Sequence, residues 1–353
     1  MILTPEDTLT EQVVYIDGKQ IGISILICTY NPEDQIFRRT LKSVESLKIP
    51  TGVPVECIII DNNSPTPVEQ LDYVREFLDR CPWARVIQET QQGLTFARIA
   101  GFRAAENSII VFIDDDNEVS PPYLEVVVDL FIKYPSVATW GPGNVNVDFM
   151  ENVPDWFSKK FKIYFQERHT KHNEYGCIPE TWAYFYPFGT GLAVKRNVLE
   201  QYCNGVENGN LCSTDRKGKS LSSGGDNQIV WEGIKMGYAA GVAAGLVVNH
   251  LIPANRSNLN YLRRLRFGTA DSYIPCMVAS FPELKPSIIA DLPSSLEIVI
   301  KVIGKTIKYL ATFKFRELSI NLANYLGSIS GQYRVIEKNS PALNFIIQQF
   351  KLR

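Results

Sequence analysis

Several features that would place a protein in a well-known class are missing from this chain of 353 residues. It has no uninterrupted run of about 18 apolar residues, which a membrane-spanning helix needs. No Gly-x-Gly-x-x-Gly follows the first apolar segment and no P-loop motif occurs, which argues against a dinucleotide-binding or P-loop fold. The formal net charge of -2 gives no overall attraction to nucleic acid, so we expect no nucleic-acid partner.

Paired cysteines are absent as well. The seven cysteines are scattered without a Cys-x-x-Cys pair, and Cys28 and Cys57 fall in apolar segments that are expected to be core strands. This pattern fits a reducing compartment better than a disulfide framework, and it does not indicate zinc. Residues 1–20 are polar and acidic with no apolar signal-like run, so we expect a cytoplasmic protein with a polar N-terminal extension.

The central feature of the sequence is residues 108–116, in which five apolar residues are followed by Asp114, Asp115 and Asp116. An apolar run of this kind predicts a strand buried on both faces, as in a parallel sheet. Three adjacent carboxylates raise one another's pKa unless a cation lies among them. We therefore predict Mg²⁺ or Mn²⁺ at the carboxyl end of this strand, where open α/β sheets bind their ligands. A solvated acidic turn is the alternative.

Apolar strands and amphipathic helices alternate along the N-terminal half. Strands are predicted at 23–29, 56–60, 84–88 and 109–113, and helices at 37–47, 68–80, 93–105 and 121–134. The third helix is expected to open at Gly93 and to be capped by Thr95. This alternation predicts a mostly parallel, doubly wound α/β sheet. Its ligand crevice is expected at residues 29–31, 61–64 and 114–116.

From about Trp140 the sequence becomes irregular and rich in aromatic residues. We expect a second hydrophobic cluster there, with a few rings lining an apolar or sugar-stacking groove. Short strands are predicted at 192–194 and 242–248, and Asp226 stands where the N-cap of a helix ending at Gly237 belongs. A solvated basic face is expected for Arg263, Arg264 and Arg266.

The C-terminal region reads as helical, with predicted helices at 294–313, 321–332 and 342–353. The first has a broad apolar face and one polar stripe. The stripe consists of Glu297, Lys301, Lys305 and Lys308. A basic amphipathic helix can lie in a membrane interface, which would give peripheral contact at the cytoplasmic face of the membrane and a lipid-linked acceptor. The alternative is a helix that packs on the preceding domain or on a partner.

Six short motifs occur in a characteristic order. They are Cys28-Thr29-Tyr30-Asn31, Ile60-Asp61-Asn62-Asn63-Ser64, Gly93-Leu94-Thr95-Phe96-Ala97-Arg98, Asp114-Asp115-Asp116, Gly189-Thr190-Gly191 and Gly225-Asp226-Asn227. In order and spacing the chain from residue 23 to 267 resembles the family 2 glycosyltransferases with a GT-A fold. The resemblance implies a GT-A domain over residues 21–270, between the extension at 1–20 and a helical region at 271–353.

The resemblance also implies roles for single residues. The residues implied to bind the donor nucleotide, its ribose and the adjoining metal are Thr29, Tyr30, Asn31, Asp61, Asp114 and Asp115. Asp116 is implied to be the direct metal ligand, and Asp226 the general base of an inverting enzyme. His250 is either a further metal ligand or a structural residue. Gly225 departs from the family pattern, which has a Glu there, and this removes a carboxylate that orients the acceptor. Arg98 could hold the phosphates, or form a surface salt bridge instead.

The chemistry can be argued without the family. Displacing a nucleoside diphosphate from a sugar leaves negative charge on the phosphate, and a divalent ion neutralises it. An acceptor hydroxyl is a poor nucleophile, so a carboxylate must take its proton. We therefore predict a metal-dependent, inverting glycosyltransferase that uses a UDP-, GDP- or dTDP-linked sugar and a glycan or lipid-linked acceptor, in polysaccharide biosynthesis of the cell envelope. The alternatives are a sugar-phosphate nucleotidyltransferase and a catalytically silent nucleotide-sugar-binding module.

Overall fold

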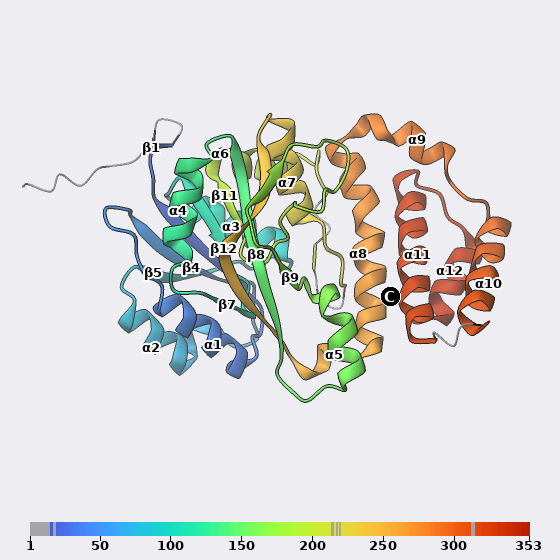
Figure 1. The fold of residues 1–353 in the computed structure, drawn as a ribbon, viewed down its shortest axis with the longest axis horizontal. Coiled ribbons are helices and arrows are strands. Elements are labelled where there is room, and N and C mark those ends of the chain that lie inside the picture. The colour runs from blue at the N-terminus through green and yellow to red at the C-terminus, as the bar shows by residue number, and fades with distance from the viewer. Residues whose placement is uncertain (1–14, 17–18, 213–214, 217, 219, 312–314) are drawn as a thin grey trace, which may run out of the picture.

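The computed structural model describes residues 15–353 apart from 17–18, 213–214, 217, 219 and 312–314. A ten-stranded sheet runs through the body of the protein, with helices on both faces (Figure 1). One half of the sheet is parallel and consists of β5 (Ala84–Gln88), β4 (Val55–Asp61), β3 (Ile23–Thr29) and β6 (Ile109–Phe112). In the other half β8 (Val137–Phe149) lies parallel to β12 (Ala239–Ile252). The predicted α/β class with a mostly parallel sheet is confirmed.

Short antiparallel strands complete the sheet. β11 (Ala193–Lys195) joins the two halves, because it pairs with β6 on one side and β8 on the other. β7 (Asn117–Val119) and β10 (Glu174–Gly176) pair with β12, and β9 (Arg168–His169) pairs with β8. A separate two-stranded ribbon, β1 (Tyr15–Ile16) and β2 (Lys19–Gln20), is the described part of the predicted N-terminal extension, and residues 1–14 lie outside the described residues.

Helices cover both faces because the inner strands are apolar on both. Along β3, Ile25 and Ile27 belong to one core cluster and Leu26 belongs to the other, as the two-residue period of a strand requires. The first cluster is covered by α1 (Asp34–Glu45), α2 (Asp72–Arg80) and α4 (Tyr123–Lys133). The second is covered by α3 (Leu94–Ala104), α6 (Arg196–Glu207) and α7 (Gly225–Lys235). This is the doubly wound arrangement that the sequence predicts.

The irregular stretch expected from about Trp140 begins later, because β8 continues to Phe149; beyond it, as far as β11, the described chain has only short elements. A Cβ on Gly141 would lie 2.5 Å from Pro187, so the glycine in this strand permits a close approach of the following loop. Pro142 pairs with Ala243, next to the point where the register of β8 and β12 shifts.

Both predictions of a side-chain cap are wrong. The N-cap of α3 is Gly93, whose N–H donates to Asn62 Oδ1 at 2.7 Å, and the Thr95 hydroxyl is buried without a hydrogen-bond partner. The N-cap of α7 is Gly224, and no side chain caps that helix. Asp226 is therefore free of the capping role that the sequence assigns to it, and its carboxylate is used elsewhere.

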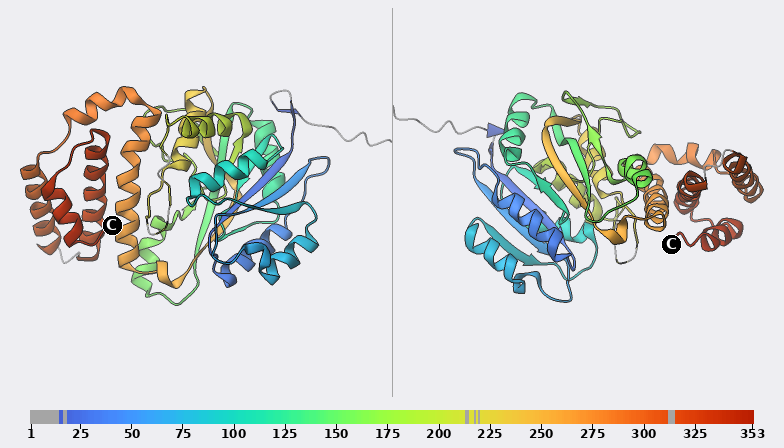
Figure 2. Two further views of the ribbon diagram at one scale, coloured as in Figure 1. Left: turned by 180° about the vertical axis from the view of Figure 1, so that it is seen from behind. Right: turned by 60° about the horizontal axis from the view of Figure 1, so that its bottom comes forward.

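The C-terminal helices lie beside the sheet body. They are α8 (Leu259–Ser280), α9 (Lys285–Ala290), α10 (Ser295–Ala311), α11 (Phe315–Val335) and α12 (Pro341–Gln349). α8 lies between the sheet and the other helices (Figures 1 and 2). α11 runs close along α8, since a Cβ on Gly327 or Gly331 would collide with the carbonyl of Phe267 or Asp271. Residues 270 and 271, the predicted domain boundary, both lie within α8, and the domain limits remain a prediction.

Two further observations concern membranes. Within the part of the chain that the structure describes, no helix is both long enough and apolar enough to cross a bilayer. The predicted amphipathic segment forms α10, and Ile298 on one face of it is buried in a cluster with residues of α11 and α12. One apolar face of α10 is therefore buried against α11 and α12.

Candidate active site

Two cavities adjoin at the carboxyl ends of the parallel strands. The first cavity has a volume of about 280 Å³ and is lined by the loops that follow β3 and β6 and by the start of α3. The second cavity has a volume of about 380 Å³ and is lined by η2 (Lys162–Phe165), α7, α8 and α11. The residues that line both are Gln166, Arg216, Ser223, Asp226, His250, Arg256 and Tyr261.

The acidic cluster of the first cavity follows β6 directly, so the sheet fixes its position. Thr29 Oγ1, at the end of the neighbouring β3, donates to Asp115 Oδ2 at 2.6 Å. Burial raises the pKa of Asp115 to about 7, and the charge of Asp116 adds to this rise. Burial and Asp116 also raise the pKa of Asp114. The carboxylates therefore crowd together, as the sequence predicts.

Asp116 differs from its two neighbours because it faces cations. Its Oδ2 accepts a hydrogen bond from Arg256 Nη1 at 2.7 Å, and its Oδ1 lies 3.6 Å from His250 Nε2. Burial opposes ionisation of Asp116, but His250 and Arg256 outweigh it and hold the pKa of Asp116 well below its usual value. Asp116 is the carboxylate of this cluster that stays ionised most readily.

His250 reaches Asp116 through strand pairing. β12 pairs with β7 so that His250 lies opposite Asn117, the residue after Asp116. The imidazole Nδ1 lies 2.8 Å from the carbonyl of Phe165. If Nδ1–H donates to that carbonyl, the neutral ring turns the lone pair of Nε2 toward Asp116, which is the orientation of a metal-binding histidine. Burial opposes the charge on His250, but Asp116 and this carbonyl raise the pKa of the ring above its usual value.

These side chains fit a divalent cation that is shared with a phosphate ligand. Among the described residues no group of three His, Cys, Asp or Glu side chains could enclose a metal by itself. Mg²⁺ and Mn²⁺, however, are commonly held by one or two protein ligands, with water and substrate phosphates completing the shell. Asp116 Oδ1 and His250 Nε2, 3.6 Å apart and turned toward each other, are suitable as that pair.

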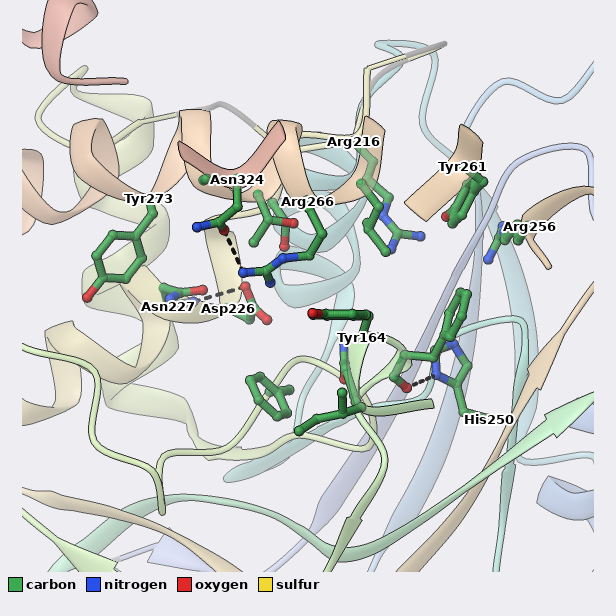
Figure 3. A pocket seen from close by; sticks show the side chains of 18 of the residues that line it. Tyr164, Arg216, Asp226, Asn227, His250, Arg256, Tyr261, Arg266, Tyr273 and Asn324 are labelled. Atoms are coloured by element: carbon green, nitrogen blue, oxygen red, sulfur yellow. Dashed lines mark hydrogen bonds between the residues drawn. The ribbon is translucent and has the colours of Figure 1, made fainter. Parts of the chain in front are cut away.

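Asp226, in the first turn of α7, lines both cavities. Its Oδ2 accepts the N–H of Gly189 at 2.9 Å. Its Oδ1 accepts the N–H of Asn227 at 3.0 Å (Figure 3). A Cβ on Gly189 would lie 3.2 Å from both this carboxylate and Arg98 Nη2, so a glycine lets the loop approach them. Two backbone donors therefore fix the orientation of the Asp226 carboxylate.

Asp215 fills the space that the unusual Gly225 leaves. A Cβ on residue 225 would lie 2.6 Å from Asp215 Oδ2 and 2.9 Å from Arg98 Nη1. These two side chains form a buried ion pair at 2.9 Å. A carboxylate of the preceding loop therefore lies beside position 225, where the side chain is missing. Arg98 is buried, which corrects the alternative of a surface salt bridge, although it still lines the first cavity.

The structure brings together most of the site residues that the sequence predicts. Those that line the first cavity are Thr29, Tyr30, Arg98, Asp114, Asp115, Asp116, Asp226 and His250. Asn31 and Asp61 are outside its wall. Asp61 is buried, and its two carboxylate oxygens accept the N–H groups of Ser64 and Val68 at 2.9 and 3.1 Å, so the structure gives it the role of shaping the loop after β4. The N–H of Asn31 donates to Ser64 Oγ in the same loop.

Sequence reasoning missed the residues that belong to no motif. These are Gln166, Asp215, Arg216, Arg256, Arg266 and Asn324. Gln166 has a left-handed backbone, with φ at 68°, and a buried Oε1 without a hydrogen-bond partner. The expectation that Arg266 belongs to a solvated basic face is wrong, because it lines the second cavity. The spacing of Gly327 and Gly331, a Gly-x-x-x-Gly that brings α11 against α8, is the signal that could have found this wall.

Comparison with known proteins adds the family. The family model described as Glycosyl transferase family 2 matches residues 24–201, half of the chain. The chain belongs to glycosyl transferase family 2. The matched region contains five of the six motifs and ends before Asp226 and His250.

Individual curated relatives match only part of this chain and at low sequence identity. The glucosyl-dolichyl phosphate glucuronosyltransferase of Haloferax volcanii is 27% identical over 141 residues, which are 39% of this chain and 43% of the relative. Polypeptide N-acetylgalactosaminyltransferase 8 of Drosophila melanogaster is 32% identical over 120 residues, 33% of this chain and 20% of the relative. The chain therefore matches less than half the length of these curated relatives.

A solved structure confirms the fold. The mannosyltransferase PcManGT from Pyrobaculum calidifontis, solved in complex with GDP-Man and Mn²⁺, superimposes with a TM-score of 0.52 at 16% identity. The superposition covers 97% of this chain and 83% of PcManGT. At this identity the likeness concerns the fold alone, which is the GT-A type that the sequence resemblance implies.

Proposed function

We propose that this member of the family is a metal-dependent, inverting glycosyltransferase, with the nucleotide-sugar donor in the first cavity and the acceptor in the second. The observation that carries the proposal is the position of Asp226, whose carboxylate lines both cavities. A group that takes a proton from the acceptor while the donor bond breaks must face both substrates. Asp226 meets that condition.

We assign separate roles in donor binding, proton transfer and charge stabilisation to residues of the two cavities. Thr29, Tyr30 and the first two carboxylates of the cluster form the wall that would hold the nucleoside. Two backbone N–H groups hold the Asp226 carboxylate, which accepts the proton of the acceptor hydroxyl while the hydroxyl oxygen attacks the anomeric carbon of the donor sugar. Because the attack comes from the second cavity, opposite the leaving group, the configuration at that carbon inverts. Arg216, which lines both cavities, adds positive charge beside the leaving diphosphate.

Asp116 and His250 are the residues that would hold Mn²⁺ or Mg²⁺. When bound, the ion supplies charge neutralisation for the departing diphosphate. The GDP-Man and Mn²⁺ in the PcManGT complex support this part of the proposal. A lipid-linked acceptor agrees with the name of the Haloferax relative, a glucosyl-dolichyl phosphate glucuronosyltransferase.

The experiment that tests the function is a calorimetric titration with UDP, GDP and dTDP, each with and without Mn²⁺. We expect one nucleotide to bind, and to bind more tightly with the metal. The matching nucleotide sugar should then be consumed with release of the nucleoside diphosphate, and NMR should show the opposite anomer in the product. Binding of nucleotide without sugar release in any acceptor mixture would favour a silent binding module. Formation of a nucleotide sugar from a nucleoside triphosphate would favour a nucleotidyltransferase.

We also propose that the outer face of α10 contacts an anionic membrane surface. Leu296, Ile300, Ile303 and Ile307 form one exposed stripe along the helix, with exposed fractions of 69, 58, 53 and 62%. An apolar stripe of this size on a surface marks an interaction site. Lys301 and Lys308 are exposed on the same helix and add positive charge that complements anionic headgroups, whereas Lys305 Nζ lies over the ring of Tyr325 on α11. The occupant that fits both features is the cytoplasmic face of a bilayer.

Flotation of the full chain with vesicles tests this contact. We expect binding to vesicles that contain phosphatidylglycerol, weak binding to pure phosphatidylcholine, and loss of binding in the double variant Ile300→Glu, Ile303→Glu. The control is Ile49→Glu, which changes an isoleucine of similar type that is 44% exposed outside the C-terminal helices. Flotation of the double variant at the level of the control would refute the contact, and so would a dimer that forms through the stripe while no protein floats.

A further inference from the structure

The second cavity contains an arginine that lacks a counter-ion. Arg266 extends from α8 into this cavity, where its Nη2 donates to Asn324 Oδ1 at 2.6 Å and its guanidinium lies 5.1 Å from the ring centre of Tyr164 (Figure 3). Neither partner is an anion. Among the described residues no carboxylate lies within 4.0 Å of the Arg266 guanidinium, the distance that defines an ion pair.

Two other arginines around the cavities have a carboxylate partner, whereas Arg216 has none within 4.0 Å among the described residues. Arg98 is paired with Asp215 and Arg256 with Asp116, at 2.9 and 2.7 Å. Arg266 is half-buried like Arg256, yet it has only an amide oxygen and an aromatic face. Burying a charge without a counter-ion is costly, and burial accordingly lowers the pKa of Arg266. A guanidinium has five N–H donors, and Asn324 takes one of them.

The wall around Arg266 suits a sugar that carries an anion. Aromatic rings line the cavity at Tyr164, Trp182 and Phe188, and rings of this kind stack on the apolar faces of sugars. The carboxylate of Asp226 lies in the same wall (Figure 3). The planar fork of a guanidinium binds the two oxygens of a phosphate or a carboxylate side by side. The cavity therefore combines a base for a hydroxyl with a separate receptor for an anion.

We infer that the acceptor carries an anionic group, a phosphate or a carboxylate, that binds Arg266 while the hydroxyl to be glycosylated faces Asp226. This inference rests on the proposed function, since it makes the second cavity the acceptor site. The anion can belong to a lipid-linked phosphate or to an acidic sugar, and both offer the same pair of oxygens to the guanidinium. Arg266 then selects the acceptor by charge as well as holding it.

The test is a titration of the full chain whose first cavity is already saturated with Mn²⁺ and the nucleoside diphosphate that binds it, so that a phosphate probe cannot enter there. The probes are glucose 1-phosphate, glucuronate, neutral methyl glucoside, and a polyprenyl phosphate in detergent. We expect at least one anionic probe to bind about tenfold or more tightly than methyl glucoside, as a charge-assisted pair implies. The phosphate, carboxylate and polyprenyl arms identify the source of the anion.

The decisive variants are Arg266→Met, which keeps the length of the side chain, and Arg266→Lys, which keeps its charge. We expect Arg266→Met to lose the preference for the anion without changing the affinity for methyl glucoside, and Arg266→Lys to restore most of it. The control is Arg103→Met, which removes an exposed arginine whose partner is Glu207 on α6. A structural role that only ties α8 to α11 through Asn324 would weaken all probes alike.

Equal affinity of the wild type for charged and neutral probes overturns the inference, and so does an unchanged preference in Arg266→Met. Either result leaves the proposed function standing if the nucleoside diphosphate and Mn²⁺ still bind. Failure of that first binding step would instead count against the proposed function itself. The two failures are therefore observed in separate titrations.

Discussion

The two cavities share Asp226 but are built in different ways. The first cavity is formed at the ends of β3 and β6, where the sheet positions the side chains and Asp115, Asp116 and Arg98 each have a partner within the protein. The second cavity is formed between η2, α7, α8 and α11, with several aromatic rings in its wall, and its Arg266 has no ionic partner among the described residues. Side chains fixed at strand ends suit a site that always binds the same nucleotide. A cavity between helices with an unpaired charge suits a site that selects among acceptors.

The largest effect is expected from a change to Asp226, the residue that the two cavities share, and it should appear in catalysis rather than in nucleotide binding. Asp226→Asn keeps an oxygen that can accept the N–H of Gly189 but cannot take a proton, so we expect sugar transfer to fall by about 10²- to 10⁴-fold. Radiolabelled donor measures the transfer, and calorimetry should show nucleotide binding unchanged. The control is Asp72→Asn, an aspartate that is exposed on α2. Transfer at the original rate would remove Asp226 from the chemistry.

A smaller effect should be confined to the first cavity. Asp116→Asn removes the charge that faces His250 and Arg256, so we expect the Mn²⁺-dependent gain in nucleoside diphosphate affinity to fall by about tenfold or more. Calorimetry with and without Mn²⁺ measures that gain, and the binding of neutral methyl glucoside in the second cavity should not change. If both cavities lose affinity together, they are coupled more closely than their construction suggests.

The difference in construction also explains what could be predicted from the sequence. β3 and β6 are almost entirely apolar runs, β3 and β5 were predicted with their observed bounds, and the acids after β6 mark the edge of the sheet. Parallel strands place their carboxyl ends at one edge, so residues 29 and 114–116 could be expected to meet there. The structure confirms that these residues line one cavity.

The second cavity could not be predicted because no local pattern encodes it. Its wall depends on how α8 and α11 dock, which follows from glycines whose missing side chains admit a carbonyl of the other helix. A run of arginines on a helix reads as a solvated face, and burial of Arg266 becomes visible only once α11 and Tyr164 are placed around it. The glycines of β8 have the same function, since they permit the close approach of neighbouring segments.

Replacing two glycines, Gly225 and Gly304, by alanine should change the free energy of unfolding by small amounts of opposite sign. Gly225→Ala places a Cβ against the Arg98–Asp215 pair in the wall of the first cavity, and we expect the free energy of unfolding to fall by about 1–3 kcal/mol. Gly304→Ala, on α10, meets nothing within 4 Å and removes a flexible residue from a helix, so we expect a gain of about 0.5–1 kcal/mol. Urea unfolding of both variants measures the changes. A stable Gly225→Ala protein would mean that Asp215 can move away, and that residue 225 is glycine for a reason other than the space that this ion pair occupies.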